Sequence, residues 1–221
     1  MQIDYCEFPD DVLYDLDNNV WVKVISQNRL RLGITSVYSA LAGKLNTVRL
    51  KPVGLVLQRT QSVASIESSR YFGVVRTPIT GTLMSVNGKL EAEPKIANDF
   101  PYSIGWFAEI DSKLDPNELG SLVELKTAQD KIHAQIGELR VRCFKAFPDY
   151  EMWEIGVECA AVLVRLNELM GRCKVNEVVH VVSDDPTADI EMERWSDQTG
   201  QAVLESRTEG KLAHFIVKKV R

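Results

Sequence analysis

The sequence predicts an α+β protein with two folded parts, a β-dominated first half and a compact α/β segment at the end. Residues 20–110 consist of short extended runs between Asn, Gly and Pro breaks. Apolar residues then recur at three- and four-residue steps through a charged stretch, and residues 150–221 alternate between strand-like and helix-like segments. These changes in the pattern of apolar and turn residues predict a β domain, a linking helix and an α/β domain, in that order.

Five runs rich in Val, Leu, Ile and Phe mark strands of the first half: "VWVKVI", "LRLGIT", "VGLVLQ", "FGVV" and "GTLMSV". Such runs between turn residues are typical of a barrel-like or sandwich-like β domain. The stretches "VYSALAGKL" and "PKIAND" leave room for short helical turns only. Residues 65–81, "SIESSRYFGVVRTPITG", have a polar tip from Glu67 to Arg70 and predict a β-hairpin that presents this tip.

A single amphipathic helix is predicted after "KLDPNELG" from apolar positions that share one helical face: Leu125, Ala128, Ile132, Ile136, Leu139, Cys143 and Phe147. Pro148 disfavours a helical conformation at the residue before it, so the helix is expected to stop there. We place the domain junction along this helix. The expected organisation is a β domain at residues 1–121, a linking helix at 122–149 and an α/β domain at 150–221.

The last segment predicts strands and helices in the order β-α-β-α-β-β, which is a two-layer α/β sandwich. The strands are expected at "YEMWEIGV", "EVVHVVS", "AVLESR" and "AHFIVKKV", and the helices at "AAVLVRLNELMG" and "PTADIEMERWSDQTG". Asp185 before Pro186 fits the cap and first turn of the second helix, and Gly200 fits its end.

Bulk composition excludes two classes of partner. The 221 residues carry a formal net charge of −5, so broad attraction to nucleic acid or to an anionic membrane is not expected. No apolar run approaches the roughly 18 to 20 residues that span a bilayer, and the N-terminus lacks the features of a signal peptide. The sequence therefore predicts a cytoplasmic protein.

The cysteines and histidines predict neither disulfides nor a metal site. Cys6, Cys143, Cys159 and Cys173 have no CxxC spacing, and the chain is large enough to fold without disulfides, so reduced thiols are expected. Core packing is the expectation for Cys143 and Cys173. His133, His180 and His214 lie far apart in sequence with no helical ligand spacing, which disfavours a zinc site. No cofactor is expected.

Residues from about 15 to 120 resemble the glycine cleavage system H protein, a lipoyl-carrier fold related to biotinyl domains. The resemblance is carried by "VWVKV", "RLGIT", "ESSRYFGVVRTPITG", "VN" at Val86 and Asn87, and "NDFPYSIGWF". It implies a barrel-sandwich hybrid in the first half. In that family the hairpin tip reads Glu-Ser-Val-Lys and the lysine amine carries lipoic acid.

The resemblance places Glu67 and Ser68 on the shared positions and Arg70 on that of the lysine. A guanidinium stays protonated and spreads its charge over its nitrogens, so it is a poor nucleophile for amide formation. We therefore expect no lipoylation at Arg70. This arginine could be a solvated turn residue, or it could bind the carboxylate of an anionic ligand or partner through two hydrogen bonds. Tyr71 and Phe72 follow it and could contact a partner or pack across the hairpin.

Residues from about 150 to the end resemble the TusA/SirA family of sulfur carriers. The resemblance is carried by "GVECAAVLVRLNEL", "EVVHVVSDDPTADIEMERWSDQTG" and "AHFIVKK". It implies that Cys159 accepts sulfane sulfur as a persulfide, although both prolines of the family's Cys-Pro-x-Pro motif are replaced here. A helix N-terminus stabilises a thiolate. Glu158 opposes ionisation, and a buried structural cysteine is the alternative.

Together these features predict a carrier or adaptor in sulfur trafficking, rather than an independent enzyme. Cys159 would carry sulfur, and the first domain would dock a protein partner of sulfur or lipoate metabolism through contact candidates on the hairpin: Glu67, Arg70, Tyr71 and Phe72. Two alternatives stay open. The chain could be a non-catalytic interaction or regulatory protein in which both modules have lost their reactive function, or an anion-binding sensor that uses Arg70.

Overall fold

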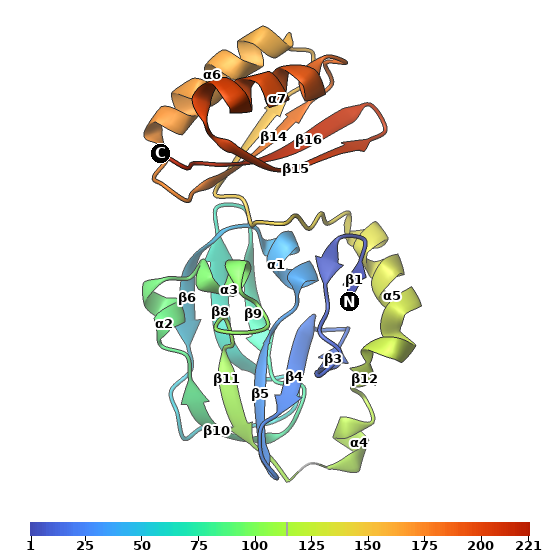
Figure 1. Cartoon of the computed structure of the whole chain (residues 1–221). Helices are drawn as coiled ribbons and strands as arrows, with labels where there is room; N and C mark the ends of the chain where they lie inside the picture. The colour runs from blue at the N-terminus through green and yellow to red at the C-terminus, as the bar shows by residue number, and fades with distance from the viewer. Residues whose placement is uncertain (114) are drawn as a thin grey trace. The chain divides into compact units, whose positions relative to one another are not determined.

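The computed structural model describes residues 1–113 and 115–221, which divide into two compact units, Met1–Cys143 and Phe144–Arg221 (Figure 1). The boundary falls within the predicted linking segment, residues 122–149, whose first part belongs to the first unit. Each unit has a hydrophobic core of its own. No helix among the described residues is long and apolar enough to cross a membrane.

Two sheets form the body of the first unit. The larger has seven strands in the order β12-β3-β4-β5-β11-β10-β7, and the smaller has the order β6-β8-β9. The larger sheet comprises β12 (Val123–Glu124), β3 (Leu13–Asp15), β4 (Val20–Val24), β5 (Arg29–Ile34), β11 (Ala108–Asp111), β10 (Gly81–Val86) and β7 (Val56–Leu57). The smaller comprises β6 (Leu45–Leu50), β8 (Ser62–Ser68) and β9 (Phe72–Arg76).

The two sheets share one core, which is the reason they pack as a sandwich. Leu30, Leu32 and Ile110 of the larger sheet and Ile66 and Val75 of the smaller belong to one buried cluster. Burial of such side chains is the main favourable term in folding. Short helices close the ends: α1 (Ser36–Ala42), α2 (Lys89–Ala92), α3 (Ile96–Asp99) and α4 (Pro116–Leu119).

The amphipathic helix is present but shorter than predicted. Helix α5 (Leu125–Leu139) ends at Arg140, which adopts a left-handed conformation with φ 51°. A second core surrounds the helix, with Leu125, Ile132 and Ile136 packed among residues from the first strands. The apolar spacing up to Ile136 therefore identified the buried face, whereas the positions beyond Leu139 follow a different path.

Cys143, in the segment that follows α5, forms a disulfide with Cys6. Cys6 lies on β2 (Cys6–Glu7), which pairs with β1 (Gln2–Ile3) in a small N-terminal hairpin. The prediction of reduced thiols was wrong for Cys6 and Cys143, whereas Cys159 and Cys173 are free. Cys143 packs against the second core, but it lies beyond the end of α5 and not on the helix. The sequence offers no CxxC signal here, since 137 residues separate the two cysteines.

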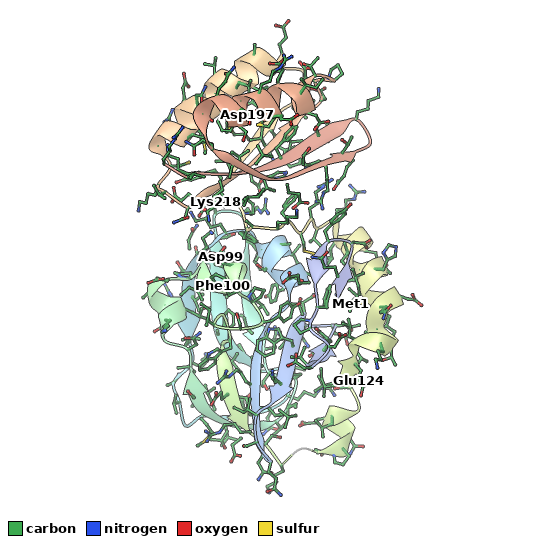
Figure 2. All side chains as sticks on the ribbon, viewed as in Figure 1. Met1, Asp99, Phe100, Glu124, Asp197 and Lys218 are labelled. Atoms are coloured by element: carbon green, nitrogen blue, oxygen red, sulfur yellow. A yellow bond between two sulfur atoms is a disulfide. The ribbon has the colours of Figure 1, made fainter. Side chains whose placement is uncertain are left out.

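The second unit has the predicted element order. A sheet of order β13-β14-β16-β15 carries two helices on one face (Figures 1 and 2). The elements are β13 (Tyr150–Glu154), α6 (Cys159–Arg172), β14 (Val178–Ser183), α7 (Ala188–Thr199), β15 (Ala202–Glu209) and β16 (Leu212–Lys218). Helix α7 ends at Gly200, which takes the left-handed conformation expected of a C-terminal stop.

Candidate functional site

The predicted hairpin is formed by β8 and β9, and its tip is the turn from Ser68 to Tyr71. Glu67 pairs with Phe72, and the Ser68 N–H donates to the Tyr71 carbonyl at 2.9 Å. The Arg70 N–H donates to the Ser68 hydroxyl oxygen at 3.2 Å. These bonds hold the tip in one compact turn with Arg70 at its apex.

Contacts with α1 hold the tip of the hairpin in place. The Ser68 hydroxyl donates to the Ala42 carbonyl at 2.7 Å, and the Tyr38 hydroxyl donates to the Val74 carbonyl at 2.9 Å. The rings of Tyr38 and Tyr71 meet edge to face, with centroids 6.0 Å apart. Tyr71 therefore packs against Tyr38 of α1.

The Arg70 side chain folds back over the end of α1. Gly43 caps that helix with φ +75°, and a Cβ built on Gly43 would lie only 2.9 Å from Arg70 Nε. Helix C-termini carry partial negative charge, so a guanidinium is favoured there. Glycine is needed at position 43 both for its backbone conformation and for the close approach of Arg70.

Glu67 and Phe72 remain on the outside of the hairpin. Phe72 is 72% exposed, which is the highest exposure among the large apolar side chains recorded as exposed in the described residues. Glu67 on the paired strand is also exposed. The tip thus presents an aromatic ring flanked by a carboxylate and by an arginine that is held against backbone.

Comparison with known proteins places this fold. A family profile described as glycine cleavage H-protein matches residues 12–135, more than half of the chain. The chain belongs to the glycine cleavage H-protein family. The match includes the hairpin and most of α5, so the resemblance predicted from the sequence is confirmed for this part, and with it the barrel-sandwich expectation.

Two sequence relatives support the same assignment over similar lengths. Glycine cleavage system H protein 2 of Aquifex aeolicus is 34% identical over 138 residues, covering 62% of this chain and 86% of the relative. A probable H protein 2 of Saccharolobus solfataricus is 33% identical over 140 residues, covering 62% and 94%. A solved H protein from Mycobacterium marinum is 22% identical, with a TM-score of 0.49, and covers 61% of this chain and 100% of its own.

Cys159 lies in the second unit, outside the H-protein domain, as the first residue of α6. It is 5% exposed and belongs to the core between the helices and the sheet. Burial raises the pKa of the Cys159 thiol above its ordinary value, and the negative charges of Asp185 and Glu191 raise it further. The thiol at this helix start is therefore held in its neutral form.

Asp185 is responsible for much of this environment. Its carboxylate accepts the Cys159 backbone N–H at 2.9 Å and the Thr187 N–H at 2.8 Å. Hydrogen bonds from Thr187 and Cys159 lower the pKa of Asp185. Asp185 thus satisfies a helix N–H that could otherwise face a thiolate. The sequence interpretation assigned Asp185 only to the next helix, which begins at Ala188, and named Glu158 as the opposing charge.

Sequence reasoning also missed a histidine pair on the sheet face opposite the helices. His180 and His214 occupy neighbouring strands, and His180 Nε2 lies 2.9 Å from His214 Nδ1. Phe144 and Trp153 surround the pair, and Arg207 lies 4.4 Å from the centre of the Phe144 ring. Pairing of β14 with β16 creates this cluster, so spacing along the chain could not reveal it. Among the described residues no group of three or more ligand side chains could hold a metal ion.

Substituting Gly43→Ala tests the contact between Arg70 and α1. We expect Gly54→Ala, at φ +93° with nothing nearby, to lose about 1 to 2 kcal/mol for its backbone conformation alone. Gly43→Ala should lose more, because Arg70 must also move. Urea unfolding measures both. Adding Arg70→Ala should reduce the excess, and an excess of the same size with and without Arg70 would rule out the contact.

Substituting Asp185→Asn tests the electrostatic control of Cys159. The change removes a negative charge but keeps an oxygen that can accept the Cys159 N–H, so the pKa of the thiol should fall. Alkylation of Cys159 by iodoacetamide at pH 8 should then be faster than in the native chain. Asp184→Asn is the matched control, since Asp184 bonds the Gly156 N–H and is not among the causes of the shift. Equal rates in both variants would contradict this account.

Proposed function

We propose that this chain is a carrier-type adaptor whose H-protein domain docks a partner protein through the tip of hairpin β8–β9 and bears no lipoyl group there. The observation that carries the proposal is Arg70, folded over Gly43 where the family resemblance places the acylated lysine. A guanidinium cannot serve as the acylated amine. Family membership supports a carrier or adaptor role for the domain.

The shape of the tip indicates what a partner would need. Exposed Phe72 offers an aromatic anchor, and Glu67 lies beside it on the paired strand. Exposed aromatic residues with a charged surround are typical of interface hot spots. A partner would present an apolar pocket with polar groups at its rim. Proteins of lipoate or sulfur metabolism are the partners that the two resemblances favour.

Docking can be measured with a lipoyl ligase and with the other glycine cleavage components as probes, in biolayer interferometry on the full chain. We expect at least one to bind, and Phe72→Ala to weaken that binding by at least tenfold. Val56→Ala is the control, because Val56 is 67% exposed on β7 of the other sheet. Equal loss in both variants, absence of binding, or a lipoyl adduct on the native chain would contradict the proposal.

Sulfur carriage by Cys159 is a second candidate function, and the position of the thiol at the start of α6 favours it. A persulfide there would require an opening of the site, since Cys159 is buried and neutral. In such a cycle the chain would act in the cytoplasm between a sulfur donor and an acceptor. If Cys159 carries no sulfur, the alternative applies in which the chain is a non-catalytic interaction or regulatory protein.

Intact mass after incubation with a cysteine desulfurase and cysteine tests sulfur carriage. The candidate function predicts a gain of one sulfur atom that reductant removes and that Cys159→Ser abolishes. Cys173→Ser is the matched control, since Cys173 is also buried and lies in the same core. A native chain that gains no sulfur, or a gain that persists in Cys159→Ser, would exclude Cys159 as the carrier.

A further inference from the structure

The Cys6–Cys143 disulfide links the first strands of the chain to the segment that follows α5. Cys6 follows directly on the turn between β1 and β2, and Cys143 is the last residue of the first unit. Met1 lies at the start of this hairpin, and its ammonium group donates to the Phe8 carbonyl at 2.9 Å (Figure 2). The Cys6–Cys143 disulfide therefore links the N-terminal hairpin, residues 1–8, to the segment that follows α5.

The hairpin has a backbone that its own sequence does not favour. Asp4 and Tyr5 form its turn with φ 47° and 67°. Two-residue turns with positive φ at both positions favour Asn-Gly, and a bulky residue there is strained. Asp4 is also held by α5, since its carboxylate lies 2.5 Å from His133 Nδ1. The hairpin depends on contacts with the α5 segment to keep this shape.

The two sulfur atoms differ in access. Cys6 is completely buried, whereas Cys143 is only partly buried. A disulfide is opened by a thiolate that reaches one of its sulfurs, so access decides which sulfur is attacked. Cys143 is therefore the more accessible residue of the pair.

We propose that Cys6–Cys143 is a thiol–disulfide exchange site that clasps the N-terminal hairpin to the end of α5 and is opened by a dithiol reductant. One thiolate of the reductant bonds to Cys143 Sγ, the Cys6–Cys143 bond breaks, and Cys6 leaves as a thiolate and takes up a proton. The second thiol of the reductant attacks the mixed disulfide and frees Cys143. Two electrons and two protons pass to the protein, and the dithiol becomes a cyclic disulfide.

Reduction of the Cys6–Cys143 disulfide leaves most of the second core in place. Val12, Tyr14 and Trp21 pack with α5 through apolar contacts that do not involve sulfur. The freed parts are the strained hairpin and residues 140–143. Reduction is therefore a local change that exposes the two ends of the first unit and leaves the H-protein sheets folded.

Hydrogen exchange on the full-length chain, with and without dithiothreitol, tests whether the disulfide holds the N-terminal hairpin in place. Amides of residues 1–8 and 140–143 should exchange at least tenfold faster after reduction, while those of β4 and β5 should not change. Equal exchange in the two states would overturn the proposal. So would loss of protection in β4 and β5, which would mean that reduction unfolds the whole unit.

Alkylation with N-ethylmaleimide tests the order of attack. Without reductant, peptide mapping should find Cys6 and Cys143 unmodified. With limiting dithiothreitol, a mixed disulfide should be trapped on Cys143 and not on Cys6. Buried Cys173 is the internal reference for a slow thiol. Four modified thiols in the unreduced chain, or first attack at Cys6, would overturn the proposal.

Discussion

The hydrogen bond from the Tyr38 hydroxyl to the Val74 carbonyl is the contact on which the position of the hairpin depends. It joins β9 of the smaller sheet to α1, which follows directly on β5 of the larger sheet. Asn98 secures the other end of α1, because its amide donates to the Gly43 carbonyl at 3.0 Å and accepts from the Leu45 N–H at 2.8 Å. With α1 fixed at both ends, Gly43 meets Arg70 in one register.

In the second unit, the charged side chain of Asp185 lies beside Cys159, the thiol that the sequence predicts to be reactive. Asp185 accepts the N–H of Cys159 and adds negative charge beside its thiol. At the hairpin tip, a guanidinium lies against the backbone that ends α1. Neither Arg70 nor the buried Cys159 thiol, whose pKa is raised, presents a free amine or a thiolate.

Local patterns predicted the elements, and long-range contacts explain the failures. Alternation and turn residues identified hairpin β8–β9 and the β-α-β-α-β-β order, because these depend on neighbours in the sequence. The disulfide from Cys143 to Cys6 joins residues far apart in the sequence, and no local spacing signals it. The pairing of His180 with His214 and the bond from Cys159 to Asp185 likewise arise only once strands and loops have assembled.

Side-chain relaxation at Arg70 tests the central claim, that the tip is a fixed contact surface and not a mobile arm. ¹⁵N relaxation of the full chain should give backbone order parameters of about 0.85 for residues 67–72, as in rigid structure. The Arg70 Nε order parameter should exceed that of Arg194, which is exposed on α7. Backbone values below about 0.6 at the tip, or an Arg70 side chain as mobile as that of Arg194, would contradict the account.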